Sequence, residues 1–169
     1  MKEEYSEGVP STAAIGGHPL HPVLVTFPIA FLIGGLASDL AYWRTDDTFW
    51  ARASLWLIAT GVVTGLFAAI FGFIDFATIR RARSAVGWTH FLGNLTAVLL
   101  SALNVWLRLG NVEGAIMPWG LGLSVLVGLI LLVTGWLGGE LTFRYKIGMV
   151  EGRERRETRT GTTAQRPIR

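Results

Sequence analysis

The sequence predicts an all-α integral membrane protein, a four-helix bundle in which sequential helices are antiparallel. Three observations support this fold class. Hydrophobic residues make up 51% of the 169 residues and charged residues only 16%, against roughly 25% charged residues in ordinary soluble proteins. Four separate stretches are long and apolar enough to cross a bilayer, which takes about 20 residues. The links between them are short, so consecutive spans return in opposite directions.

The four predicted spans follow one another along the middle of the chain. They cover residues 22–43, 51–74, 85–107 and 115–141. The first starts at His21-Pro22, because proline is favoured at the first position of a helix and the residue before it prefers an extended conformation. Pro28 lies inside this span and leaves the carbonyl of Leu24 without its helical donor, which predicts a kink. The links RTDDTFWAR, DFATIRRARS and RLGNVEG separate the spans.

Polar segments flank the predicted four-helix domain, which covers residues 18–144. Residues 1–17 are polar and acidic, unlike the basic start of a secretory signal, so the first apolar run is expected to remain as a membrane span. Residues 145–169 are charged, rich in threonine and almost free of large apolar side chains. This composition predicts a disordered tail.

Lysine and arginine are distributed unevenly between the two ends of the predicted bundle. The end that carries both termini and the second link holds twelve of the 15 basic residues, and the opposite end holds Arg44, Arg52 and Arg108. Cytoplasmic loops of membrane proteins carry an excess of Lys and Arg, so both termini are predicted to be cytoplasmic. The net charge of +3 comes mostly from the tail, which does not indicate nucleic-acid binding.

Polar and ionisable side chains gather at this predicted cytoplasmic end. Each span contributes to the group, and all three histidines belong to it: His18, His21, Asp75, His90, Asn94 and Glu140. His90 lies about 7 Å into the third span at 1.5 Å per residue, and Asn94 follows one turn later on the same helical face. Because polar groups inside membrane spans are costly and often functional, this group is the candidate site.

Several of these residues also have a structural interpretation. His21 can cap the first helix and His18 can lie in a surface loop. Asp75 and Glu140 can pair with arginines at the interface, and the candidates are Arg80, Arg81 and Arg144. His90 is the hardest to explain in this way, because an imidazole below the interface needs a partner.

The opposite end of the bundle carries fewer polar groups. Asp39 lies near the outer end of the first span, and we expect it to form a structural ion pair or hydrogen bond with Asn104 or Arg52. No histidine lies at this end of the spans, so no second metal site is predicted there.

Three sequence blocks resemble a bacterial family of four-helix membrane proteins of unknown function, the family numbered 2231. The blocks are HPLHPVLVTFPIAF, WTHFLGNL and GWLGGELTFRYKIG, and the similarity covers about residues 16–150. The resemblance implies a multi-pass protein of the bacterial cytoplasmic membrane. It carries over these positions: His18, His21, His90, Asn94, Gly138, Gly139 and Glu140. The family also looks distantly like membrane cytochromes b and is found beside Rieske-type proteins, which implies a Rieske-type or other redox protein as partner.

The first functional hypothesis is a membrane protein that binds haem b for electron transfer. Cysteine is absent, which excludes thiolate ligands and covalent haem attachment through CxxCH. Bis-histidine ligation needs two imidazoles at similar depth on facing helices, and His21 with His90 is the best pair. The residues expected to make room for the ring or to meet its propionates are Gly65, Gly72, Gly135, Arg80, Arg81 and Arg83.

Two further hypotheses remain open. A non-haem site for Zn²⁺, Fe²⁺ or Cu²⁺ would use nitrogen and oxygen ligands, here His18, His21 and His90 with Glu140 or Asp75. Asn94 would then orient a ligand. The other hypothesis is a structural or transport subunit without a cofactor. Four spans are few for a transporter, so transport would require a homo-oligomer. No HExxH motif or nucleophile constellation indicates a particular enzyme.

Overall fold

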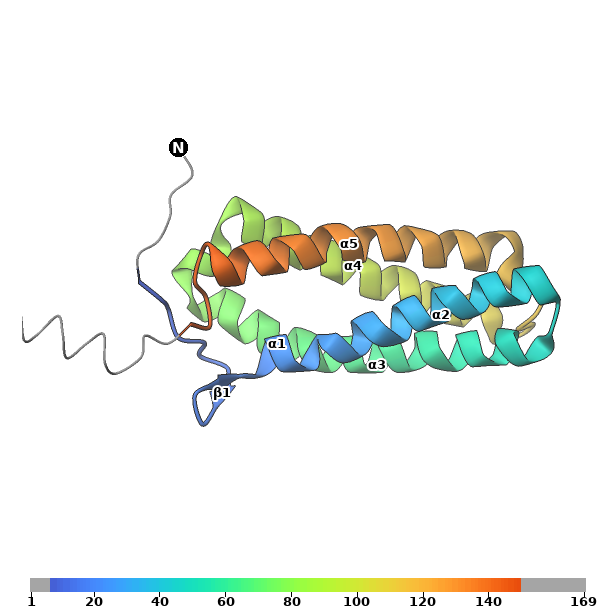
Figure 1. Ribbon diagram of the computed structural model, residues 1–169, viewed down its shortest axis with the longest axis horizontal. Helices are drawn as coiled ribbons and strands as arrows, with labels where there is room; N and C mark the ends of the chain where they lie inside the picture. The colour runs from blue at the N-terminus through green and yellow to red at the C-terminus, as the bar shows by residue number, and fades with distance from the viewer. Residues whose placement is uncertain (1–6, 150–169) are drawn as a thin grey trace, which may run out of the picture.

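The computed structural model, which describes residues 7–149, is a bundle of four long helical segments (Figure 1). The first segment is α1 with α2, followed by α3, α4 and η2 with α5. Their bounds are Leu20–Leu24, Thr26–Thr45, Thr48–Thr78, Ala85–Arg108, Ile116–Gly120 and Leu121–Phe143. α2 packs most extensively on α3, and α4 on α5, so the bundle consists of two helical hairpins that face each other. The predicted fold class is confirmed.

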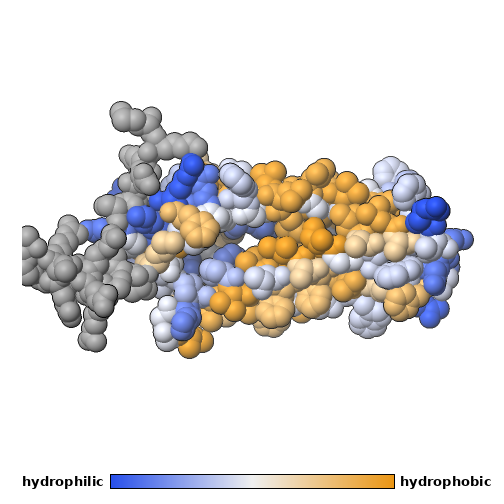
Figure 2. Space-filling view, in the orientation of Figure 1, coloured by the Kyte–Doolittle hydropathy of each residue, from blue (hydrophilic) through white to orange (hydrophobic). Residues whose placement is uncertain are grey.

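All four segments are long and apolar enough to cross a membrane. The candidate spans are Leu20–Thr45, Thr48–Thr78, Ala85–Arg108 and Ile116–Phe143. Large apolar side chains on their outer faces are exposed, among them Trp56 at 73% and Leu132 at 71%. On the face that Figure 2 shows, hydrophobic residues cover the middle of the bundle and hydrophilic residues gather at its two ends. This distribution suits a protein whose middle faces lipid.

The helices extend beyond the predicted spans because polar residues continue the backbone hydrogen bonding at their ends. α3 begins at Thr48, where the Asp47 carboxylate accepts a hydrogen bond from the N–H of Phe49 at 2.9 Å. It continues to Thr78, although the predicted span ends at residue 74. Hydropathy marks the part of a helix that meets lipid, so it places both ends of α3 too far inward.

The first span is broken near Pro28, which confirms the predicted kink. α1 and α2 are separate helices that meet at Val25. The N–H of Ile29 lies 3.4 Å from the carbonyl of Val25, whereas the preceding backbone bond is 2.9 Å long. Pro28 has no N–H to donate to Leu24, so the regular helix cannot pass through this turn.

The buried core takes one apolar residue from each segment: Leu32, Ile58, Ala97 and Val127. Glycine allows α2 and α3 to approach closely at this level. A Cβ on Gly61 would lie 2.7 Å from Cδ2 of Leu32, and a Cβ on Gly35 would lie 2.6 Å from Cγ1 of Ile58. Small residues at helix interfaces permit such contacts in membranes, where helix packing depends on van der Waals contact.

A short β-hairpin that hydropathy does not reveal precedes α1. β1 (Ala14–Ile15) pairs antiparallel with β2 (His18–Pro19). The turn residues Gly16 and Gly17 have φ values of 58° and 83°. A two-residue hairpin turn of type I′ needs positive φ at both positions, which glycine adopts most readily. The Gly-Gly pair is therefore the sequence signal for this hairpin.

Residues 145–149, which the composition assigns to the tail, pair with the N-terminal segment. The N–H of Val9 donates to the carbonyl of Lys146 at 2.9 Å, and the N–H of Gly148 donates to the carbonyl of Val9 at 2.8 Å. Both described chain ends therefore meet at one end of the bundle, here called the terminal end; the opposite end is called the distal end. The rest of the predicted disordered tail, residues 150–169, lies outside the described residues.

Candidate functional site

His21 and His90 meet between the two hairpins at the terminal end. His21 is the second residue of α1, and His90 is the sixth residue of α4. Their ring centres are 6.2 Å apart, and the ring planes are inclined at 85°. Both side chains are half-buried. The structure thus brings together the two histidines that the sequence singles out as a pair.

Each imidazole is held by a backbone carbonyl of a neighbouring helix. Nδ1 of His21 lies 2.9 Å from the carbonyl oxygen of Ala68 on α3, and Nδ1 of His90 lies 2.8 Å from that of Thr134 on α5. A carbonyl oxygen only accepts hydrogen bonds, so each Nδ1 carries a proton and donates it. In a neutral imidazole, Nε2 is then unprotonated and has a free lone pair.

The two Nε2 atoms are accessible. Neither has a hydrogen-bond partner among residues 7–149. Within the same residues, every fully buried side-chain nitrogen or oxygen does have a partner, so neither Nε2 is enclosed. α1 packs on α3. Histidines that bind metals usually donate their other ring N–H to a carbonyl or carboxylate in this way.

Asn94 lies one turn after His90 and connects α4 to α5. Its Nδ2 donates to the carbonyl of His90 at 2.7 Å, and its Oδ1 accepts from the Thr134 hydroxyl at 3.2 Å. Thr134 therefore contacts His90 through its carbonyl and Asn94 through its side chain. This arrangement fixes the backbone and the ring of His90 against α5.

The other predicted metal ligands lie apart from the histidine pair. His18 is exposed on β2, and Glu140 forms a 3.0 Å ion pair with Arg144, one turn along the same helix. Within the described residues, no group of three or more His, Cys, Asp or Glu side chains is placed to hold a metal ion. The predicted five-residue ligand set is therefore not brought together.

Asp75 fastens the N-terminal segment to α3 instead. Its carboxylate accepts hydrogen bonds from the Ser11 hydroxyl at 2.7 Å, from the N–H and hydroxyl of Thr12 at 2.9 Å, and from the N–H of Ala13 at 3.0 Å. The predicted pairing of Asp75 with an arginine is therefore wrong. The N-terminal segment folds back over the end of the bundle, and hydropathy gives no sign of this.

Replacing Asp75 with asparagine is expected to loosen the N-terminal segment. The amide has one acceptor oxygen instead of two and no charge, while hydrogen bonds to charged groups contribute about 1.5–3 kcal/mol each. Amide exchange of residues 7–19, followed by mass spectrometry, should accelerate by about tenfold or more. Glu140→Gln removes a carboxylate at the same end and should leave this exchange unchanged. Equal exchange in both variants would contradict the anchoring role.

The glycines predicted to make room for a cofactor occupy different surroundings. A Cβ on Gly72 would lie 2.7 Å from Nδ1 of His21. A Cβ on Gly138 would likewise lie 3.0 Å from Cε1 of His90. A Cβ on Gly65 would meet Val98 and Pro28, and a Cβ on the exposed Gly135 would meet nothing within 4 Å. Two glycines thus face the two rings: Gly72 belongs to the set predicted to make room for the ring, and Gly138 to the positions that the family resemblance carries over.

The arginines predicted to meet haem propionates lie on η1 (Arg80–Arg83), which joins α3 to α4 at the terminal end. Arg80 and Arg83 are exposed. Arg81 donates from Nη1 to the carbonyls of Glu7 and Tyr145 at 2.9 and 3.0 Å. It therefore connects the N-terminal and C-terminal segments.

A buried ion pair at the distal end connects all four segments. Nη1 and Nη2 of Arg108 each donate to one carboxylate oxygen of Asp39 at 2.8 Å, and both side chains are completely buried. The hydroxyls of Ser54 and Ser124 donate to the same carboxylate. Asn104 accepts from Nε of Arg108 at 2.9 Å. Every polar group of the network is satisfied, so it is a closed structural connection.

This network corrects the predicted partner of Asp39. Its ion-pair partner is Arg108, and Arg52 is exposed. In the sequence Arg108 follows the predicted third span and counts as a loop charge. α4 extends through Arg108. The side chain of Arg108 enters the bundle, where it supplies the counter-charge that the buried carboxylate of Asp39 needs, because such a carboxylate alone is strongly destabilising.

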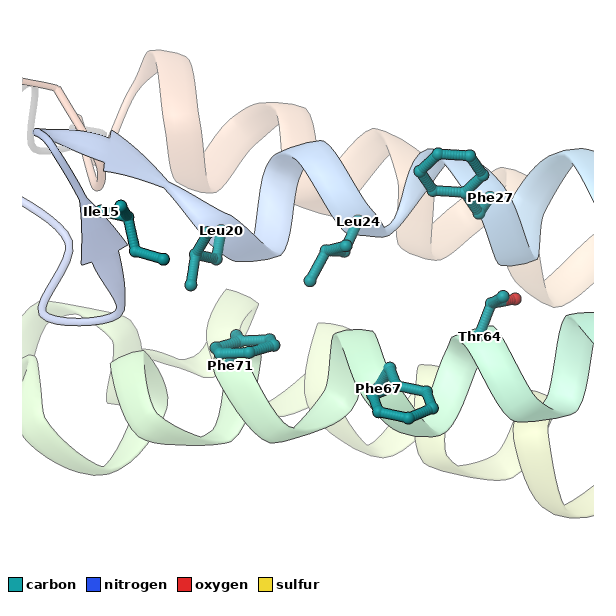
Figure 3. Close-up of a pocket in the computed structure, with 7 residues that line it drawn as sticks. All are labelled: Ile15, Leu20, Leu24, Phe27, Thr64, Phe67 and Phe71. Atoms are coloured by element: carbon teal, nitrogen blue, oxygen red, sulfur yellow. The ribbon is translucent and has the colours of Figure 1, made fainter.

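An apolar groove of about 440 Å³ lies on the outside of the bundle between the first segment and α3 (Figure 3). Its lining residues are Ile15, Leu20, Leu24, Phe27, Thr64, Phe67 and Phe71. The hydroxyl of Thr64, the polar member, donates to the carbonyl of Thr60 at 2.8 Å. The residues that line the groove include no ionisable or metal-binding side chain.

Comparison with known protein families agrees with a membrane protein. The family model described as "Predicted membrane protein (DUF2231)" matches residues 17–151. The chain belongs to the DUF2231 family. The match includes both hairpins and both histidines of the pair, and it confirms the family that the three sequence blocks indicate. No curated protein and no solved structure matches the chain, and the resemblance to membrane cytochromes b receives no support.

Proposed function

We propose that this DUF2231 protein is a membrane haem protein in which Nε2 of His21 and Nε2 of His90 would hold the iron of one haem b. The supporting observation is the pair of imidazoles whose Nδ1–H groups are both fixed by backbone carbonyls. The two ring centres are 6.2 Å apart, which is close enough for both rings to reach one metal ion at a metal–nitrogen distance of about 2 Å.

The donor set fits haem iron better than a non-haem ion. Zinc sites use three or four protein ligands, and many non-haem Fe²⁺ sites use two histidines with a carboxylate. The described residues place no third such ligand beside the histidine pair. Haem iron requires only axial ligands from the protein, because the porphyrin supplies the other four nitrogens.

Haem b held by two histidines supplies a reversible one-electron couple. The carbonyls of Ala68 and Thr134 would orient the two imidazoles. Aromatic rings connect α3 to α4 beside His90 in the sequence. Phe76 stacks on Phe91 at 4.9 Å and meets Trp88 edge-on at 4.8 Å.

The charge distribution supports a cytoplasmic location of the terminal end in a bacterial cytoplasmic membrane. Because Arg108 is buried in its ion pair, the exposed basic residues of the distal end are Arg44 and Arg52. The positive-inside rule then favours the terminal end as the cytoplasmic one even more strongly. Arg80 and Arg83 are exposed at that end, where they would meet haem propionates.

The proposed partner is a Rieske-type or other redox protein that docks at the terminal end. Both axial histidines come from one chain, so the site needs no second copy, and a homo-oligomer would form through the lipid-facing surfaces.

The proposal is tested by absorption spectra of the protein purified in detergent after expression with a haem precursor. We expect a Soret band, a dithionite-reduced minus oxidised difference spectrum, and one haem per chain in a pyridine haemochrome assay. His21→Ala combined with His90→Ala should abolish all three signals. His18→Ala is the matched control and should retain them, since His18 is exposed and apart from the pair.

Two results would overturn the haem assignment. Colourless protein with one transition-metal ion per chain, lost in the double histidine variant, would replace haem by a non-haem metal. Folded protein with neither haem nor metal would leave a structural or transport subunit.

A further inference from the structure

Two pairs of residues face each other across the bundle with the same separation in the sequence. His90 follows His21 by 69 positions, and Arg108 follows Asp39 by the same 69 positions. The first pair lies at the terminal end, and the second forms the ion pair at the distal end. Each pair takes one residue from the α1–α2 segment and one from α4. These two segments therefore occupy equivalent places in the two hairpins.

The second helices of the hairpins are equivalent as well. Each hairpin contains a histidine, a residue whose carbonyl accepts its Nδ1–H, and a glycine four positions after that acceptor. These residues are His21, Ala68 and Gly72 in the first hairpin, and His90, Thr134 and Gly138 in the second. The acceptor and the glycine of the second hairpin each follow their counterparts by 66 positions.

The position of the glycine explains how a ring reaches a helical carbonyl. In a helix, the carbonyl of residue i accepts from the N–H of residue i+4, and the Cβ of residue i+4 leans back toward the helix N-terminus. A side chain there would crowd the carbonyl. A Cβ would lie 2.7 Å from Nδ1 of His21 if placed on Gly72, and 3.0 Å from Cε1 of His90 if placed on Gly138. Alanine at either position must displace the ring.

We infer that the histidine site is two-fold symmetric because the bundle is an internal repeat of one hairpin, and that Gly72 and Gly138 are its positioning residues. Each glycine opens the backbone of one helix to one imidazole and holds that imidazole in its Nδ1–H form. The two histidines are then equivalent donors. The part of the inference that concerns iron binding rests on the proposed function. The protons on the two Nδ1 atoms can be measured with or without iron.

The test is nitrogen NMR of histidine side chains in the detergent-solubilised, dithionite-reduced full-length protein, labelled with ¹⁵N-histidine. In the wild-type protein, His21 and His90 should both show a protonated Nδ1. Gly72→Ala should disturb the Nδ1–H signal of His21 alone, and Gly138→Ala that of His90 alone. Gly135→Ala is the matched control on α5, because a Cβ on Gly135 would meet nothing within 4 Å, and it should change neither signal.

A wild-type protein with Nε2–H on either histidine would overturn the inference, whether or not the glycine variants fold. Equal disturbance of both histidines by one glycine variant would overturn the assignment of one glycine to each ring. Retention of both Nδ1–H signals in Gly138→Ala would also overturn the assignment of one glycine to each ring. The haem assay is independent, since protein without haem can still show both Nδ1–H signals, and protein with haem can lack this pattern.

Discussion

Arg108→Met is expected to lower the free energy of unfolding by about 3–5 kcal/mol, the usual cost of removing one partner from a buried ion pair. The substitution leaves the carboxylate of Asp39 completely buried without its counter-charge. Ser54 and Ser124 still donate to that carboxylate, but hydroxyl donors do not neutralise it. Because the network contacts all four segments, its loss weakens the packing of the whole distal end.

The double variant Asp39→Leu with Arg108→Met separates the charge effect from the packing effect. Replacing both members of a buried ion pair with apolar residues is often neutral or stabilising. Here Ser124 and Asn104 would lose partners, so recovery should be partial. The double variant should nevertheless be more stable than either single variant.

Both effects can be measured by unfolding the purified protein from mild detergent with increasing amounts of SDS, followed by circular dichroism. Arg52→Met is the matched control, because Arg52 is exposed at the same end and surface substitutions usually change stability by less than about 0.5 kcal/mol. An Arg108→Met protein within about 1 kcal/mol of the wild type would show that the pair contributes less than its burial implies.

The sequence predicts the four spans well because hydropathy depends only on composition along the chain. It places helix ends too far inward where polar residues cap a helix, as Asp47 does at the start of α3. Hydropathy also misses structure that does not depend on apolar runs. The β-hairpin at Gly16 and Gly17, and the attachment of the N-terminal segment to Asp75, both arise outside the spans.

The histidine pair could be predicted because His21 and His90 lie at similar depth on parallel segments. The carbonyls of Ala68 and Thr134 could not, because any helical residue has a carbonyl, and only the facing glycines show which ones a ring can reach. The predicted depth of a residue along a span also fails to identify buried side chains at helix ends. Arg108 looks like a loop charge until the third helix is seen to extend through it.

On the proposed function, His21→Gly and His90→Gly would each leave the haem iron with one histidine ligand and one open position. With both imidazoles as ligands, the reduced wild-type protein would not bind carbon monoxide. Either variant would bind it. Added imidazole should restore the wild-type spectrum, and about 10 mM would nearly saturate a site with a Kd of about 1 mM.

The rescue by imidazole distinguishes a ligand from a residue that only supports the fold, because free imidazole replaces the missing donor but not the covalent link to α1 or α4. The two variants should respond alike, since each ring is held by a carbonyl and a glycine in the same manner. His18→Gly should keep the wild-type spectrum and should not bind carbon monoxide. A six-coordinate spectrum in either variant without added imidazole would exclude that histidine as an axial ligand.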